Sequence, residues 1–244
     1  MKVLCVLLLS LFAACAEVDP PYEVKINLDP ASTPALLPQL TAGGKFDQRT
    51  SIFYKINGAS PTSIAIVRVR RTAKKSDITV KLRGIHELSA SVLASTTLDL
   101  EDIDFEYDAK LREPGEGKLS ADIKIDHQDI TFPTDGATVM SMLTPDQKEL
   151  LAIGARRPIH KLSLTECPGT LADLYKNLPP PPGCDEATVE VWPFPDEPLY
   201  ELSCNTETLE EARAGLEGVI ASVGAVAAAD QRGKTERSLA LCQA

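Results

Sequence analysis

SIAIVRVRRTAKKSDITVKLRG, residues 63–84, contains the pattern that decides the fold class. Apolar and polar residues alternate with a period of two on both sides of a polar turn. A β-strand places successive side chains on opposite faces, so the pattern predicts two strands, each with one apolar and one polar face. Such strands are typical of antiparallel sheets. The polar positions are strongly basic and include Arg68, Arg70, Lys81 and Arg83.

The same alternation extends outward over residues 22–135. It recurs in YEVKINLD, SIFYKIN, LDLEDIDFEYDAKL and KLSADIKID, and turn signals such as Asn57-Gly58 separate the segments. Residues 29–48, rich in proline and glycine, are predicted as a long loop with at most one helical turn. We therefore expect an N-terminal antiparallel domain at 22–135, either a β-sandwich or a strongly curved sheet.

The pattern changes after residue 138. TPDQKELLAIG predicts a helix with Thr144 as its N-cap and Pro145 in its first turn. GTLADLYKNL is interpreted as a short helix, PPPPG as a stiff proline spacer, ATVEVW as a strand and residues 207–230 as the longest helix. The predicted fold class is therefore α+β, with a helical, proline-rich, disulfide-containing region at 138–244.

The N-terminus predicts export. Lys2 precedes an apolar run of about ten residues, which is shorter than the ~20 needed to span a bilayer and typical of a signal peptide at 1–14. The stretch around Cys15 resembles a bacterial lipobox, in which a cut before Cys15 leaves that cysteine lipidated, for example with palmitate. A cut after Ala16 is the alternative and releases a soluble chain. We expect an outer membrane lipoprotein of the bacterial cell envelope, attached to the membrane through its lipid, or otherwise a secreted, extracellular protein.

Four cysteines remain after such a cut, and an even number in an exported chain predicts two disulfides. The favoured pairing is sequential, Cys167 with Cys184 and Cys204 with Cys242. A crossed pairing, Cys184 with Cys204 and Cys167 with Cys242, requires the end of the last helix to lie near Cys167. The cysteine and histidine spacing does not fit a structural zinc site.

One strand is acidic and is the weak candidate for a metal site. Its carboxylates could bind calcium, which takes six to eight oxygen ligands. The basic segment at 68–83 offers these acids ion-pair partners, and the sequence favours that interpretation, with no metal and no cofactor. The acidic side chains are Asp99, Asp104, Glu106 and Asp108.

Catalysis has little support in the sequence. GxSxG, HExxH and a glycine-rich phosphate loop are absent, and no residue is assigned a catalytic role. The formal charge of −10 argues against nucleic acid as a partner. The helix at 207–230 has small residues at helical spacing, and is expected to pack on its own sheet or, alternatively, on a protein partner.

These observations favour a non-catalytic, envelope-anchored lipoprotein that acts as a binding or structural module. The first alternative is a soluble secreted carrier of an apolar ligand, which requires a cavity lined by the apolar strand faces. The second is an extracytoplasmic enzyme, which requires a cleft that joins a carboxylate to His86, His127 or His160.

Overall fold

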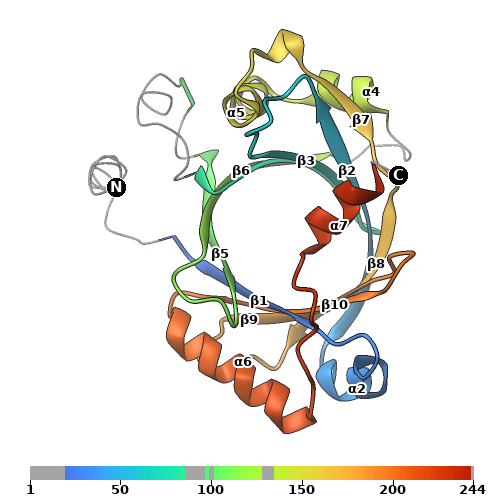
Figure 1. Ribbon diagram of the computed structural model, residues 1–244, viewed down its shortest axis with the longest axis vertical. Coiled ribbons are helices and arrows are strands. Elements are labelled where there is room, and N and C mark those ends of the chain that lie inside the picture. Colours follow the sequence, from blue (N-terminus) through green and yellow to red (C-terminus); the bar gives the residue numbers. More distant parts are fainter. Residues whose placement is uncertain (1–19, 86–96, 99–101, 128–134, 243–244) are drawn as a thin grey trace.

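A computed structural model describes residues 20–85, 97–98, 102–127 and 135–242. Nine strands in this part of the chain form a closed barrel, in the order β3-β4-β6-β5-β1-β10-β9-β8-β2, and β2 pairs with β3 to close it (Figure 1). Every neighbouring pair is antiparallel except β1–β5. The strands are β1 (Tyr22–Leu28), β2 (Lys45–Asn57), β3 (Ala65–Arg71), β4 (Ser76–Arg83), β5 (Asp104–Lys110), β6 (Lys118–His127), β8 (Thr170–Leu178), β9 (Glu186–Trp192) and β10 (Leu199–Thr206).

The long strand β2 is what closes the barrel. It has 13 residues and pairs with β8 along its first half and with β3 at residues 50–54. Its last residues pair with the short strand β7 (Ser163–Glu166), which lies outside the closed ring. Because β2 and β3 pair with each other, the nine-stranded sheet has no unpaired edge strand.

Helices cover the outside of the barrel on two sides (Figure 1). α4 (Gly136–Met142) and α5 (Pro145–Ala155) pack over β3, β4, β6 and β7, while α2 (Thr33–Leu40) and α6 (Leu209–Val223) pack over β1 and β10. α5 begins with the predicted N-cap Thr144, which forms a capping box with Gln147. No helix in the described ranges is long and apolar enough to cross a membrane.

The apolar faces of the strands point outward, beneath these helices. On β3, for example, Val67 and Val69 are fully buried in the outer core, whereas Arg68 and Arg70 line the interior. Period two is therefore correct for these strands, but the face that we expected to meet solvent encloses the lumen. The helices supply the apolar partner that the second sheet of a sandwich would have supplied.

The last helix, α7 (Lys234–Leu241), crosses the inside of the barrel (Figure 1, red). Its end packs, through Leu239, Leu241 and Cys242, on an apolar cluster that includes Phe53 and Trp192. Trp192 alternates with the outward Val189 and Val191 and therefore points inward. α7 fills this side of the barrel, and the remaining interior is a cavity.

The predicted fold class is wrong. The structure is a barrel, not an N-terminal sandwich followed by a helical region, because residues 170–206 supply three strands to the same sheet as residues 22–127. Residues 170–178, interpreted as a helix, form β8, in which Thr170, Ala172 and Leu174 are buried in strand alternation. The helix predicted at 207–230 ends at Val223, where Gly224 adopts a left-handed φ of 71°. The loop predicted at 29–48 contains α2 and the start of β2.

Candidate functional site: a charged lumen

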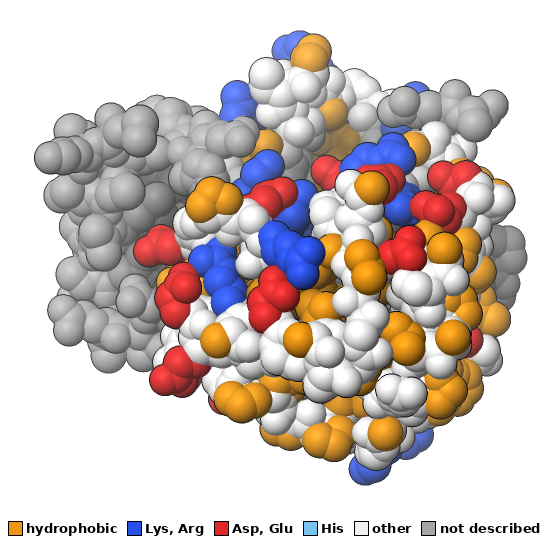
Figure 2. All heavy atoms as spheres, turned by 60° about the horizontal axis from the view of Figure 1, so that its bottom comes forward, with side chains coloured by type: hydrophobic (Ala, Val, Ile, Leu, Met, Phe, Trp, Pro, Cys, Tyr) orange, Lys and Arg blue, Asp and Glu red, His pale blue; other side chains and the backbone are white. Residues whose placement is uncertain are grey.

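The barrel encloses a cavity of about 600 Å³, and most of the side chains that line it carry charge. Figure 2 shows Lys and Arg side chains gathered at the centre of one face of the molecule, with Asp and Glu side chains beside them. The cationic lining residues are Lys25, Arg49, Arg68, Arg70, Lys81, Arg83, Lys124 and Lys234. The acidic ones are Glu23, Asp104, Glu106, Asp122, Glu186 and Glu190.

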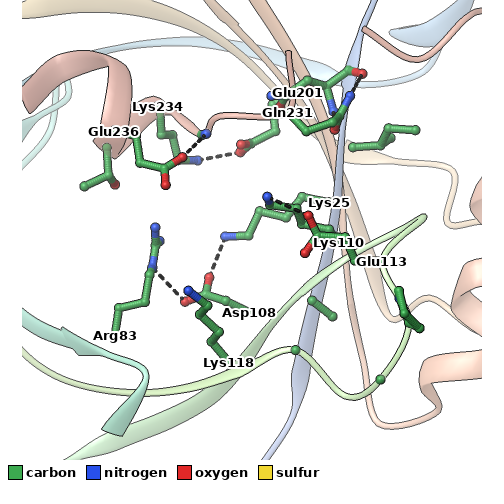
Figure 3. Close-up of a pocket in the computed structure, with 18 residues that line it drawn as sticks. Lys25, Arg83, Asp108, Lys110, Glu113, Lys118, Glu201, Gln231, Lys234 and Glu236 are labelled. Atoms are coloured by element: carbon green, nitrogen blue, oxygen red, sulfur yellow. Dashed lines mark hydrogen bonds and ion pairs between the residues drawn. The ribbon is translucent and has the colours of Figure 1, made fainter. Parts of the chain in front are cut away.

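A second cavity of about 350 Å³ adjoins the first (Figure 3). Lys25, Arg83, Lys234 and Thr235 line both cavities, so these side chains stand between them. The close-up shows Lys25 and Arg83 converging on Asp108 from different strands. The two cavities are thus parts of one lumen that charged side chains divide.

Asp108 on β5 is the centre of one ion-pair cluster. Its carboxylate lies 2.8 Å from Lys25 Nζ, 3.3 Å from Lys81 Nζ and 3.3 Å from Arg83 Nε. Burial alone would raise the pKa of Asp108, but the three cations, Lys25 foremost, outweigh it and hold that pKa well below its usual range. Asp108 is therefore ionised and binds β1, β4 and β5 together through charge.

Lys234 on α7 is the centre of a second cluster. Its Nζ lies 2.8 Å from both Glu190 on β9 and Glu201 on β10. Glu190 also accepts from Arg49 and from the indole nitrogen of Trp192, each at 2.8 Å. Burial would raise the pKa of Glu190, yet Lys234 and Arg49 lower it strongly. The C-terminal helix thus contributes a cation to the interior of the barrel.

Arg68 differs from the other lumen cations. Arg70 pairs with Asp77 at 3.0 Å, but the side chain of Arg68 forms no hydrogen bond or ion pair with any other described residue, and its buried Nε lacks a partner there. Burial, and after it repulsion from Arg70 and Arg49, lowers the pKa of Arg68 to about 9. Asp77 and Asp122 attract this charge and offset these effects only in part, and a buried charge without a direct partner is costly, so this part of the lumen favours an anion.

The strand register extends this positive region. Arg68 on β3 is aligned with Thr79 on β4, and Thr79 is aligned with Lys124 on β6. The lumen row across these three strands therefore contains two cations and no acid, and the Thr79 hydroxyl between them donates to Asp77 at 3.1 Å. Within the described ranges, the side chain of Lys124 also forms no hydrogen bond or ion pair.

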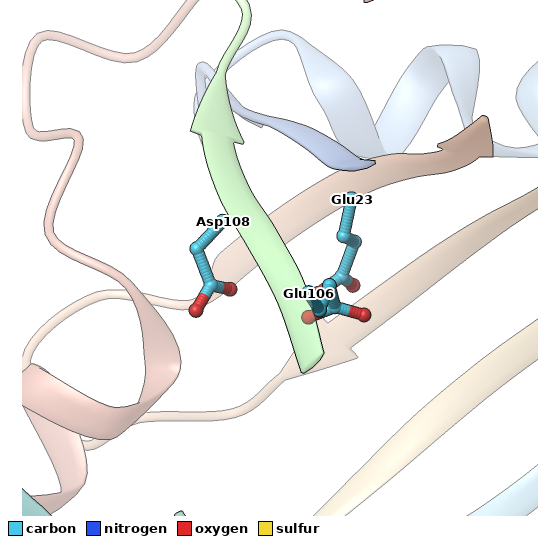
Figure 4. Close-up of side chains that lie close together, drawn as sticks. All are labelled: Glu23, Glu106 and Asp108. Carbon is cyan, nitrogen blue, oxygen red and sulfur yellow. The ribbon is translucent and has the colours of Figure 1, made fainter. Parts of the chain in front are cut away.

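Three carboxylates gather on β5 and β1, the strands that follow β6 around the barrel (Figure 4). Ligand atoms of Glu23, Glu106 and Asp108 lie within 4.8 Å of one another. Burial, together with repulsion from Glu23, raises the pKa of Glu106. Lys25 pairs with Glu23 as well as with Asp108, whereas the Glu106 carboxylate forms one ion pair among the described residues, with Lys81 at 3.1 Å. Glu106 is therefore the least neutralised of the three, and carboxylate oxygens at this spacing are suitable ligands for a divalent cation.

We call the inner faces of β1 and β5 that carry Glu23, Glu106 and Asp108 the carboxylate wall. Three of the four weak metal candidates of the sequence analysis lie on it. Asp104, Glu106 and Asp108 share the inner face of β5, while Asp99 lies outside the described residues. The expected ion pairs with the basic segment are present, and Lys81 and Arg83 reach β5 across β6, which lies between the two strands.

The disulfides follow the crossed pairing and not the favoured sequential one. Cys167 bonds Cys242, and Cys184 bonds Cys204, with Cα–Cα distances of 4.9 and 5.7 Å. The sequential pairing assumed that a long, straight helix separates Cys204 from the C-terminus. Instead the chain turns after α6 and enters the barrel as α7, which brings Cys242 to Cys167.

The other site residues of the sequence analysis lie away from the lumen or outside the description. His127 and His160 line neither cavity, and His86 and Cys15 fall among the residues that are not described. Several charged lumen residues were not singled out in the sequence, among them Glu23, Lys25, Arg49, Asp122, Lys124, Glu186, Glu190, Glu201 and Lys234. Those on strands were visible as charges that alternate with apolar residues, but that pattern is also typical of a solvated face.

The fold resembles that of solved enzymes. A protein from Hippeastrum, described as a "putative adenylyl cyclase" that reveals a dominant triphosphatase activity, aligns with a TM-score of 0.62 and 12% identity over 89% of this chain and 94% of its own. A "putative adenylate cyclase" from Bacillus halodurans aligns with a TM-score of 0.51 and 12% identity over 90% and 97%. This chain has the same barrel fold. No family model and no curated protein matches the sequence.

The predicted function is therefore wrong. A non-catalytic lipoprotein module was inferred from the lipobox-like N-terminus and from the absence of catalytic motifs, whereas the barrel has a charged interior and the fold of proteins described as cyclases, one with triphosphatase activity. The carrier alternative required an apolar cavity, and the lumen is lined by charge. The signal peptide, lipoprotein and palmitate assignments belonged to the same interpretation, and they concern residues outside the described ranges.

Proposed function

We propose that the lumen binds inorganic triphosphate, or another short polyphosphate, and hydrolyses its terminal phosphoanhydride bond. The observation that carries this proposal is the acid-free row of Arg68, Thr79 and Lys124, next to Arg49 and Arg70. The chain as a whole carries a formal charge of −10, so this concentration of cations is not a consequence of composition.

A linear polyphosphate matches this row chemically. Guanidinium groups bind phosphate oxygens bidentately, and Lys adds a point charge. Charge–charge attraction is stronger inside a protein than in water, because the effective dielectric constant is lower. The triphosphatase activity of the Hippeastrum protein with the same fold supports this ligand class.

The carboxylate wall would hold a divalent cation next to the phosphates. Glu106 would be the first ligand, with Glu23 beside it, and burial raises the pKa of Glu106. Mg²⁺ typically binds through one or two carboxylates and completes its coordination with substrate phosphates. When bound, such an ion neutralises the charge that develops on the phosphate oxygens.

The reaction requires only water as a co-reactant. The water oxygen attacks the terminal phosphorus, and the bond between that phosphorus and the bridging oxygen breaks. The bridging oxygen leaves on diphosphate, and the water proton is released to the solvent. The lumen cations hold the triphosphate in place and stabilise the negative charge on the diphosphate leaving group.

A second candidate is polyphosphate binding without hydrolysis. It is favoured by one observation: Asp108 and Glu190 are already neutralised by lysines and arginines, which leaves few carboxylates for metal binding or base catalysis. The two candidates differ in phosphate release and not in binding.

The test is to measure triphosphate binding by calorimetry and phosphate release with Mg²⁺ or Mn²⁺ on the same full-length protein. We expect both, and we expect Glu106→Gln to lower release about a hundredfold while binding persists. Glu116→Gln, on an exposed turn, is the matched control and should change neither. Binding without release favours the second candidate, and absence of binding contradicts the proposal.

A further inference from the structure

We propose that the Cys167–Cys242 disulfide controls the affinity of the lumen for polyphosphate, because it holds Lys234 inside the barrel. This inference rests on the proposed function for its ligand. It adds a residue from the C-terminal helix to the site and makes that site responsive to reduction.

Lys234 is the only basic side chain of the larger cavity that α7 supplies among the described residues; the other seven belong to barrel strands. It neutralises Glu190 and Glu201, which are 6% and 2% exposed. Glu201 forms no other ion pair within the described ranges. If Lys234 left, two buried carboxylates would face the lumen, and Arg49, which pairs with Glu190, would be their remaining ion-pair partner among the described residues.

The attachment of α7 depends on contacts with the barrel and on the disulfide at Cys242. The helix has eight residues, and helices this short are marginal on their own in water. Besides its apolar end and the buried Thr235 and Ser238, α7 is held by Lys234, by the disulfide at Cys242 and by Arg237, which donates to the carbonyl of Glu197 at 3.1 Å and lies over the ring of Phe194. The segment before it is held by hydrogen bonds between Asn27 and Gln231. The disulfide joins residues 75 positions apart and so keeps the C-terminus next to β7, where the chain would otherwise be free to leave.

Reduction breaks the Cys167–Cys242 disulfide. A dithiol donates two electrons and two protons, the S–S bond becomes two thiols, and the dithiol itself becomes a cyclic disulfide. Once Cys242 is released, α7 leaves the lumen in a larger fraction of molecules. Polyphosphate then meets one cation fewer and two uncovered carboxylates, so it binds more weakly.

The two disulfides provide a matched comparison. Cys184–Cys204 ties β10 to the loop before β9, and Cys204 packs with the outer core below α6. Cys184→Ser/Cys204→Ser leaves Cys167–Cys242 as the disulfide that can respond. In this variant we expect reduction with a dithiol to weaken triphosphate binding about tenfold, and reoxidation to restore it. Cys167→Ser/Cys242→Ser should bind as weakly as the reduced form, whatever the redox state.

Lys234 is tested in the same background. Lys234→Arg should retain affinity, while Lys234→Met should lose about tenfold and then show no further loss on reduction. Such non-additivity is expected only if the disulfide acts through Lys234. Glu201→Gln combined with Lys234→Met removes the unpaired carboxylate, and it provides a second variant if the single one is unstable.

The release of α7 can also be measured in the absence of ligand, by tryptic cleavage after Arg237. Arg237 is 6% exposed, and we expect it to be protected in the oxidised protein and cleaved after reduction. Redox-independent triphosphate affinity overturns this inference and leaves the proposed function intact. Absence of triphosphate binding in every form, with Arg237 still protected only when oxidised, contradicts the proposed function instead.

Discussion

Arg68 is the residue on which the account depends most. Its guanidinium lies among other arginines, and burial and their repulsion lower its pKa to about 9. Such a side chain lowers the stability of the folded state, so its presence indicates a role in binding. Stabilising substitutions at functional positions commonly cost activity, because binding sites retain strain or unpaired charge.

Arg68→Met therefore tests stability and binding in one variant. We expect the free energy of unfolding, measured with urea, to rise by about 1–2 kcal/mol, because an uncompensated charge is removed. We expect triphosphate affinity, measured by calorimetry, to fall at least about tenfold. Lys74→Met, on an exposed turn, is the control and should leave both unchanged. Lower stability with unchanged affinity would assign Arg68 a structural role.

The pH dependence of binding follows from the same residue. Arg68 is charged below a pKa of about 9 and neutral above it, and phosphate prefers the charged form. Triphosphate affinity should therefore fall as pH rises through about 9. Binding measured between pH 7 and 10 should show this decrease in the wild-type protein and not in Arg68→Met. An identical decrease in both would place the titrating group elsewhere.

At the scale of the element, β5 shows how charge on one strand face determines stability. Asp108 attracts Lys25, Lys81 and Arg83 and has a strongly lowered pKa. A lowered pKa adds stability above the unfolded-state value of about 3.9, and that stability is lost as pH falls below it.

Asp108→Asn leaves three cations without their shared partner. We expect a loss of about 3 kcal/mol in unfolding free energy at pH 7. Between about pH 4 and pH 2 the wild-type protein should lose stability more steeply than the variant, because the variant lacks the titrating carboxylate. Asp126→Asn removes a pair in which both side chains are about half exposed, and should cost at most about 0.5 kcal/mol. Equal effects of the two substitutions would contradict this assignment of Asp108.

Individual elements were predictable where one pattern dominated. The alternation at 63–84 gave β3 and β4, and the N-cap and proline at 144–145 gave the start of α5. β8 was mistaken for a helix because Leu171, Leu174, Tyr175 and Leu178 also fit helical spacing. Its pairing with β2 and β9 decides the conformation, and that information lies outside the segment.

At the scale of the whole molecule, alternation fixes the two faces of a strand but not which of them is enclosed. In a sandwich the apolar faces meet each other. Here helices cover those faces, and barrel closure gathers the polar ones into a lumen. The site could not be predicted from the sequence, because its charges come from strands far apart in the chain and from α7.

The central claim is that this lumen binds a short polyphosphate, and the most direct test is a crystal structure of the full chain with inorganic triphosphate. The account predicts triphosphate inside the barrel, with phosphate oxygens within hydrogen-bond distance of Arg68 and next to Lys124. Triphosphate on the outer surface, with Arg68 still without a partner in the lumen, would contradict it.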